Sequence, residues 1–254
     1  LIKAAIKCFG EYCREHGVDP GSRNFTIGYR TNIPVRVGLA GSSAIVTAVL
    51  RALMTFFDVQ IPEEILPNLI LSAERDELGI SAGLQDRVIQ VYEGVVFMDF
   101  QRAIMERSGH GRYERLAPTA LPPLFVAYHD RLAEGTEIVH DELRSRFNRG
   151  EPAVIDAMDR LADLAQQARD LIIAGRGPEI GPLMDANFDL RATICPISEG
   201  HRALVAIGRR LGASVKFAGS GGAVIGAYDG DPDRLDQLRK AFAEFGAPLI
   251  IPEI

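Results

Sequence analysis

Apolar residues recur along this chain at spacings that predict a mixture of helices and strands. The first stretch is helical by this criterion, because its apolar side chains share one helical face: Leu1, Ile2, Ala5, Ile6, Phe9 and Cys13. Residues 42–57 repeat the pattern, and residues 62–78 and 84–92 are also predicted to be helical. Alternating apolar and polar positions at 24–30 predict a strand, and the run GVVFMDF at 94–100 predicts a buried one.

The second half of the chain follows a proline-rich joint at Pro118–Pro123, where we place a boundary between domains 1–118 and 119–254. Strands are expected at 124–130, 214–218, 223–228 and 247–251, and helices at about 136–149, 151–174, 179–195, 199–212 and 231–245. The strands at 214–218 and 223–228 would form a hairpin flanked by helices on one face. This order predicts an α+β layer and not a doubly wound sheet.

Composition excludes several classes of function. The net charge of −6 gives no reason to expect binding to nucleic acid or to an anionic membrane. No apolar run is long enough for a membrane span and no signal-peptide pattern is present, which predicts a cytoplasmic protein with Cys8, Cys13 and Cys195 as reduced core thiols. Because a helical pattern starts at the first residue, we expect that material is missing upstream.

The segment Val37–Ala44 (VGLAGSSA) has the chemistry of an anion-binding loop at the start of a helix. Gly38 and Gly41 allow a ligand to approach the main chain, and the hydroxyls of Ser42 and Ser43 are suited to capping the helix. Unpaired N–H groups in the first turn would then face a phosphate. A plain turn before a buried helix would use similar residues, and the spacing matches neither a Walker loop nor a Rossmann loop.

Two further segments carry chemistry that is ambiguous when each is taken alone. In SAERDELGISAGLQDRV at 72–88, Glu74 and Asp86 could hold a hard cation and orient an acceptor hydroxyl, although single acids are more often solvated or capping residues. In KFAGSGGAV at 216–224, three glycines between two strands form either a tight hairpin or a loop whose amides approach a polar group.

Together and in this order, the three segments resemble the GHMP kinase superfamily, and GLAGSSAIV and GLQDRV resemble its glucuronokinases in particular. The second family signature corresponds to Pro34 with GLAGSSA, which has one extra residue, and the third corresponds to Lys216 with its glycine cluster. The resemblance implies that the first loop wraps the triphosphate of ATP, and its residues are Gly38, Leu39, Ala40, Gly41, Ser42, Ser43 and Ala44. The second loop would close over phosphates and acceptor with Gly219, Ser220, Gly221 and Gly222.

The same resemblance implies roles for the acids. Ser43 and Glu74 would coordinate Mg²⁺, with Glu77 as a competing ligand if the spacing hides an insertion, and Asp86 would be the catalytic base or an orienting group. Arg191, with Asp189 nearby, would suit the carboxylate of a sugar acid, although a helix-surface ion pair is the plainer interpretation.

The resemblance further implies an α+β, two-domain GHMP kinase fold, with an incomplete N-terminal half like a domain of ribosomal protein S5 and a ferredoxin-like C-terminal half. The expected activity is ATP- and Mg²⁺-dependent phosphorylation of a sugar acid, D-glucuronate at its anomeric hydroxyl, by a monomer or homodimer. Other acceptors, such as another sugar or mevalonate, stay open. So does a catalytically incomplete binding homologue, because the first family signature has no counterpart in this sequence.

Overall fold

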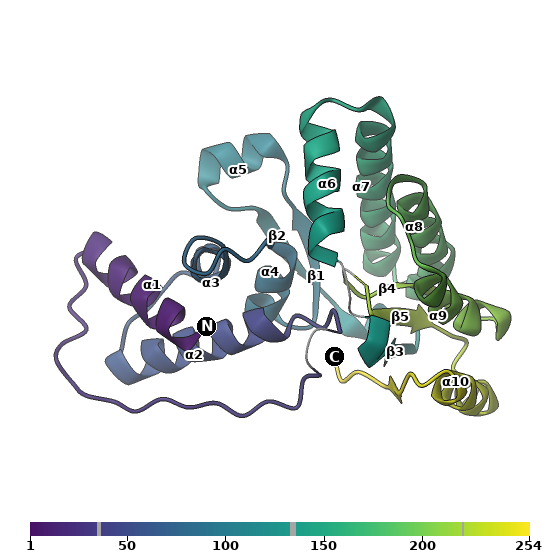
Figure 1. The fold of residues 1–254 in the computed structure, drawn as a ribbon, viewed down its shortest axis with the longest axis horizontal. Coiled ribbons are helices and arrows are strands. Elements are labelled where there is room, and N and C mark those ends of the chain that lie inside the picture. Colours follow the sequence, from purple (N-terminus) through teal and green to yellow (C-terminus); the bar gives the residue numbers. More distant parts are fainter. Residues whose placement is uncertain (35–36, 133–135, 220) are drawn as a thin grey trace. The chain divides into compact units, whose positions relative to one another are not determined.

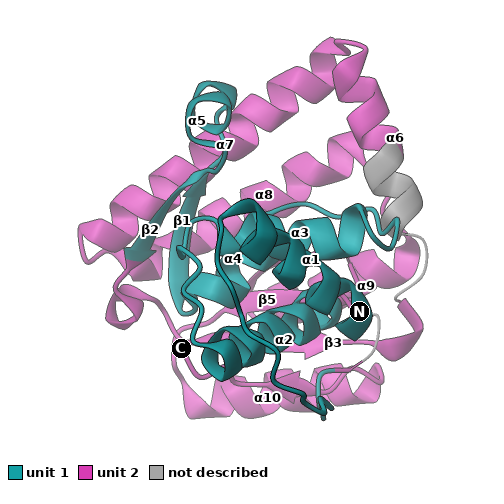
Figure 2. Cartoon of the chain, turned by 90° about the vertical axis from the view of Figure 1, so that its left-hand side faces the viewer, with its two compact units in different colours: residues 1–33, 40–115 teal, residues 34–39, 116–254 magenta. Residues whose placement is uncertain are grey.

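The computed structural model describes residues 1–34, 37–132, 136–219 and 221–254, and it separates into two compact units (Figure 2). Unit 1 consists of residues 1–33 and 40–115, and unit 2 consists of residues 34–39 and 116–254. The first glycine loop is therefore shared, because Pro34–Leu39 belongs to unit 2 while Ala40 and the helix after it belong to unit 1. The boundary at 118/119 stays a prediction.

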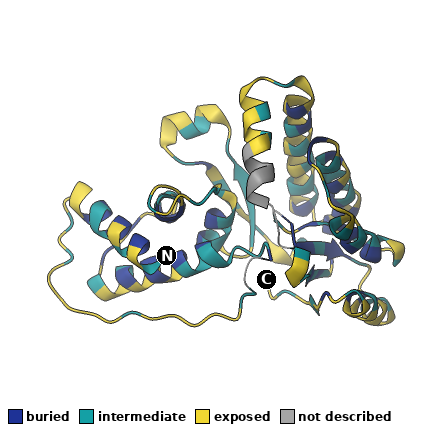
Figure 3. Cartoon of the chain, viewed as in Figure 1, coloured by how far each residue is buried: buried dark blue, intermediate teal, exposed yellow. Residues whose placement is uncertain are grey.

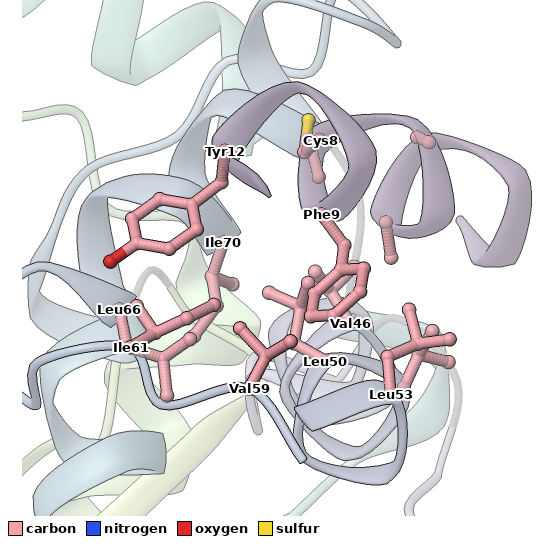
Figure 4. Close-up of a cluster of buried hydrophobic side chains, with 14 of the residues drawn as sticks. Cys8, Phe9, Tyr12, Val46, Leu50, Leu53, Val59, Ile61, Leu66 and Ile70 are labelled. Atoms are coloured by element: carbon pink, nitrogen blue, oxygen red, sulfur yellow. The ribbon is translucent and has the colours of Figure 1, made fainter. Parts of the chain in front are cut away.

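Unit 1 is built mainly from four helices, α1 (Ile2–Glu15), α2 (Gly41–Phe57), α3 (Leu66–Arg75) and α4 (Gln85–Tyr92). Apolar residues at helical spacing give each of α1 and α2 one buried side (Figure 3). Phe9 of α1 points toward Val46, Leu50 and Leu53 of α2 in the core of this unit (Figure 4). This packing fixes where α2 begins, and so where its first turn lies.

Strands β1 (Val95–Asp99) and β2 (Arg112–Leu116) form a two-stranded sheet, with the short helix α5 (Arg102–Ser108) between them (Figure 1). The residues of β1 are half-buried and not buried as predicted, because only one other strand pairs with it. The strand predicted at 24–30 is wrong. No strand of the described residues pairs with this segment, and a strand needs a partner for its backbone groups. Phe25 packs instead against Phe56 and Phe57, with ring centroids 5.7 Å from each.

Unit 2 contains an antiparallel sheet of four strands in the order β4-β5-β3-β6. The strands are β3 (Leu124–Tyr128), β4 (Ser214–Phe217), β5 (Ala223–Ala227) and β6 (Leu249–Ile250). Helices α6 (Thr136–Asn148), α7 (Pro152–Ile173), α8 (Gly181–Ile194) and α9 (Glu199–Arg210) connect β3 to β4, and α10 (Pro232–Glu244) connects β5 to β6. This order of elements and strands is ferredoxin-like, which confirms the α+β prediction and the β4–β5 hairpin. Short 3₁₀ turns are η1 (Pro118–Ala120), η2 (Asp130–Leu132) and η3 (Gly177–Ile180).

The two faces of this sheet meet different surroundings. Phe125, Val215 and Phe217 lie in a buried cluster with Leu204 of α9 and Phe242 of α10. Strand residues alternate between faces, so Lys216 lies on the opposite face, beside Ile225 in the register of β4 and β5. The glycine turn of the β4–β5 hairpin projects from the end of these strands (Figure 1).

Two simple predictions can be checked directly. Cys8, Cys13 and Cys195 are free and buried, as expected for core thiols. Among the helices that the structure describes, none combines the length and the apolar character that crossing a membrane demands.

Candidate active site

In unit 1, the start of α2 has the features of an anion-binding helix end. Ala40 precedes the helix with φ 54° and ψ 32°, a left-handed conformation that is uncommon for a residue other than glycine. The first intrahelical bond runs from the amide of Ala44 to the oxygen of Ala40, 3.1 Å apart, so the amides of the preceding residues need partners outside the helix. Neither serine caps the helix as predicted, because no side chain accepts from its first turn.

Ser43 is fully buried, and its hydroxyl donates a 2.9 Å hydrogen bond to the oxygen of Ala40. This bond supports the left-handed turn before the helix. Ser42 is half-buried beside it. The loop therefore offers backbone amides and a hydroxyl oxygen at the positive end of a helix, a combination that suits phosphate groups.

Glu74 lies at the end of α3 with no exposed surface, and Arg87 of α4 neutralises it. The Arg87 Nε and Nη2 atoms both approach the Oε2 atom of Glu74, at 2.7 Å and 2.5 Å. The second carboxylate oxygen, Oε1, is buried and has no hydrogen-bond partner among the described residues. A buried acceptor without a partner is costly, so this oxygen fits a ligand such as a hard cation.

Asp86 occupies the first turn of α4, and its side chain is 50% exposed. Arg87 reaches it as well, because its Nη1 atom lies 3.3 Å from the Oδ2 atom of Asp86 and donates to the oxygen of Gly83 at 3.0 Å. The competing acid, Glu77, is bound by Lys7, whose Nζ atom lies 2.7 and 2.6 Å from its two oxygens. One arginine therefore contacts both predicted acids and does not contact Glu77.

In unit 2, the two glycine segments touch through their backbones. Gly38 has φ +76°, and a Cβ atom placed there would overlap the carbonyl oxygen of Gly221. A Cβ atom on Gly219 would lie 3.0 Å from the oxygen of Gly38, and one on Gly222 would lie 3.0 Å from the oxygen of Val37. Gly222, the last glycine of the cluster, is therefore needed for the close approach of the two segments as well as for the hairpin turn. Ser220 lies outside the described residues.

Basic side chains surround this second loop. The Arg191 Nη1 atom of α8 donates to the oxygen of Gly219 at 2.9 Å. His201 of α9 lies with its Nε2 atom 3.1 Å from the amide nitrogen of Gly222, and burial lowers its pKa. Lys216 of β4 donates through Nζ to the oxygen of Phe217 at 2.8 Å, and burial followed by the charge of Arg191 lowers its pKa to about 8.

Asp189, the other residue predicted to bind the acceptor, forms its ion pair with a different arginine. Its side chain is 61% exposed and accepts from the Nη1 atom of Arg209 at 2.7 Å. Arg209 also pairs with Asp185, with its Nε atom 2.8 Å from the carboxylate. Asp189 is thus engaged in an ion pair on α8, whereas the half-buried Arg191 contacts the glycine loop.

Comparison with known proteins identifies the family. Residues 1–94 match the model of the GHMP kinases N terminal domain. The chain is 38% identical to Glucuronokinase 1 of Arabidopsis thaliana, over 98% of this chain and 70% of that protein. It is 40% identical to Probable glucuronokinase 2 of the same plant, over 97% of this chain and 68% of that protein. The chain belongs to the GHMP kinase family.

The fold of this GHMP kinase agrees with solved members. The structure of Streptococcus pneumoniae phosphomevalonate kinase in complex with phosphomevalonate and AMPPNP covers 99% of the chain with a TM-score of 0.72, at 16% sequence identity. The alignment includes 80% of that structure. The predicted two-part GHMP kinase fold is confirmed by this likeness.

Three residues interact with predicted site residues of their own unit but had no role assigned from the sequence of this GHMP kinase. Arg87 directly follows Asp86 in GLQDRV, and only the fold shows that it also reaches Glu74. Lys216 was noted as part of a signature without a role of its own. No sequence pattern indicated a role for His201, because its contact with Gly222 joins residues far apart in the sequence.

Proposed function

We propose that this GHMP kinase transfers the γ-phosphoryl group of ATP to a sugar acid, and specifically to the anomeric hydroxyl of D-glucuronate. The observation that carries the proposal is the identity of 38% and 40% to two glucuronokinases across nearly the whole chain. The loops and acids described above supply the groups that phosphoryl transfer requires. A structurally similar kinase is described with AMPPNP, an ATP analogue, which supports ATP as the donor.

The proposed step forms a bond between the anomeric oxygen and the γ-phosphorus, and it breaks the bond from that phosphorus to the oxygen bridging to the β-phosphate. Asp86 accepts the proton of the acceptor hydroxyl or orients that hydroxyl for attack. The backbone of Gly38–Ala44 and Gly219–Gly222 holds the phosphates, and Arg191 contacts the acceptor.

Glu74 and Ser43 are the proposed ligands of Mg²⁺. The fit rests on the unpartnered, buried Oε1 atom of Glu74 and on the hard oxygen donors that both side chains offer. The bound ion would neutralise charge on the transferring phosphates. Arg87 binds the other carboxylate oxygen, Oε2, through two nitrogens and does not occupy Oε1.

A panel of acceptors assayed with ATP and Mg²⁺ tests the proposal. D-glucuronate, D-galacturonate, D-glucose, D-galactose and mevalonate are compared by ADP release, and the product is examined by phosphorus NMR. We expect D-glucuronate to have the highest kcat/KM and its product to show coupling between phosphorus and the anomeric proton. Phosphorylation of galactose or mevalonate without any phosphorylation of glucuronate would overturn the assignment, and nucleotide binding with no turnover on any acceptor would favour a non-catalytic homologue.

A further inference from the structure

Arg191, His201 and Lys216 form a basic cluster beside the second glycine loop of unit 2. Arg191 contacts Gly219, and its guanidinium also lies over the ring of Phe217, 5.2 Å from the centroid. The ring of His201 lies against the same phenylalanine, with 5.3 Å between centroids. Arg191 of α8 and His201 of α9 thus meet at the end of β4, and Lys216 of that strand lies close enough to Arg191 to be affected by its charge.

Lys216 carries a charge that no described carboxylate pairs with. Its Nζ atom donates to the oxygen of Phe217, which occupies one of the three donors of an ammonium group. In the described part of the chain, Lys216 forms no ion pair with a carboxylate, and the charge that most affects it is the like charge of Arg191. Its depressed pKa agrees with this geometry.

A purely structural role does not account for a lysine at this position. Side chains do cover the outer edge of β4, since Asp185 accepts from the amide of Val215 at 2.9 Å and Arg209 donates to its oxygen at 3.3 Å. The charge of Arg209 is balanced by Asp185 and Asp189, however, whereas that of Lys216 is not. A neutral amide could satisfy the oxygen of Phe217 without placing a second cation next to Arg191.

Two neighbouring cations in a half-buried site imply an anionic ligand. The proposed function assigns the start of α2 and the backbone of the glycine loops to the nucleotide phosphates, which leaves the carboxylate of the acceptor as the anion for this pair. A guanidinium presents parallel donors that match a carboxylate, and an ammonium adds a point charge beside it.

We propose that Lys216 and Arg191 together bind the carboxylate of the sugar acid, and that this pair sets the preference for an acid over a neutral sugar. The inference rests on the proposed function, because it names the residues that recognise the acceptor. Arg191 keeps its contact with Gly219 and so couples the carboxylate site to the glycine loop.

Steady-state kinetics of Lys216→Gln and Arg191→Gln test the pair. Lys240→Gln is the matched control, because it removes the same charge from an exposed position of α10 in the same unit. Both site variants should raise the KM for D-glucuronate at least about tenfold, and the ratio of kcat/KM between glucuronate and glucose should fall. The KM for ATP should change less than about twofold in Lys216→Gln, whereas Arg191→Gln also removes the bond to Gly219 and should raise it less than it raises the KM for D-glucuronate. Lys240→Gln should match the wild type. Thermal unfolding of each variant confirms that it is folded.

Proton uptake on binding provides a second measurement. Lys216, with a pKa of about 8, is partly neutral at pH 8, and a carboxylate beside it would raise that pKa and draw a proton from solution. Titration calorimetry of D-glucuronate into the enzyme saturated with AMPPNP, in buffers of different ionisation enthalpy, should show uptake of a fraction of a proton at pH 8. The Lys216→Gln protein should lose this uptake, although it keeps Arg191, whose charge acts on Lys216.

The outcomes separate the inference from the proposed function. If the wild type phosphorylates glucuronate but the Lys216→Gln protein keeps its KM and its proton uptake, the carboxylate site is wrong while the function stands. If the KM for ATP rises in both variants and that for glucuronate does not, the cluster binds the nucleotide phosphates. If the wild type does not use glucuronate at all, the proposed function itself fails.

Discussion

At the scale of single residues, Arg87 has the most contacts with the proposed catalytic acids. Its guanidinium donates to Glu74 through two nitrogens, and the third nitrogen contacts both Asp86 and Gly83. Because Arg87 is almost fully buried, these contacts hold the side chain in one orientation. The proposed metal ligand and the proposed catalytic acid are thus positioned by one cation, so their separation is fixed by the fold of unit 1.

Replacement of Asp86 with asparagine tests its role in the chemical step. The Asp86→Asn side chain keeps its size but cannot accept a proton or carry a charge, so kcat should fall by about 10²–10⁴-fold while the affinity for ATP changes little. Steady-state kinetics with D-glucuronate and fluorescence titration with a labelled nucleotide measure the two quantities.

Asp76→Asn serves as the control for this change, because Asp76 is an exposed aspartate of the same unit that pairs with Arg75. It should keep the activity of the wild type. Near wild-type turnover in the Asp86→Asn protein would remove Asp86 from the mechanism.

At the scale of elements, the two glycine segments of unit 2 contact each other through their backbones. Gly38 precedes α2 and Gly221 lies in the β4–β5 hairpin, yet a single methyl group on Gly38 would overlap the oxygen of Gly221. The hairpin therefore contacts the segment that leads into α2, the helix proposed to bind phosphate. The glycines at these positions are explained by this close approach and by positive φ angles.

Gly38→Ala should therefore impair catalysis more than it impairs folding. The change combines the cost of a left-handed alanine, roughly 1–2 kcal/mol, with displacement of the Gly221 carbonyl, and we expect the KM for ATP to rise at least about tenfold. Gly175→Ala is the matched control, since Gly175 has φ +70° in the same unit and open space around it. It should lower the unfolding midpoint only by the cost of the left-handed alanine and leave the KM for ATP unchanged. Equal effects of the two substitutions on that KM would contradict a role for loop contact.

Sequence patterns predicted elements better than they predicted contacts. The four-residue repeat of α2 and the glycine turn between β4 and β5 were sufficient to predict those elements, because both signals are local. The strand at 24–30 failed because alternation describes one segment and says nothing about a partner for it. The prediction that Ser42 or Ser43 caps the helix is wrong. Ala40 precedes the helix in a left-handed conformation, and its oxygen accepts a hydrogen bond from the Ser43 hydroxyl.

In the candidate site, too, the sequence indicated single residues but not the contacts between them. Glu74 and Asp86 were chosen by their place in a family pattern, and the structure adds the arginine that contacts both. Lys216 and Arg191 are separated along the chain and meet only because α8 lies along β4. Such pairs depend on tertiary packing, which spacing in a single sequence does not encode.

At the scale of the whole molecule, each unit has hydrophobic clusters of its own. The core of unit 1 is formed by α1–α4 with residues such as Leu50, and the sheet core of unit 2 includes Leu204, both with no exposed surface. Because the units have separate cores, we expect two cooperative folding units. Leu50→Ala and Leu204→Ala are a matched pair that tests this, because each removes the same atoms from one core.

Each substitution should cost about 2–5 kcal/mol in the unit that carries it. Hydrogen exchange measured by mass spectrometry then locates the loss. In the Leu50→Ala protein, amides of α1–α4 should exchange faster while those of β3–β5 keep their wild-type protection, and the Leu204→Ala protein should show the reverse. Faster exchange in both units of either variant would mean that the chain unfolds as one cooperative body, and the proposed boundary at 118/119 would then have no energetic meaning. If each substitution instead affects only its own unit, the amides of the glycine segment Pro34–Leu39 should exchange faster in the Leu204→Ala protein and not in the Leu50→Ala protein, because this segment belongs to unit 2.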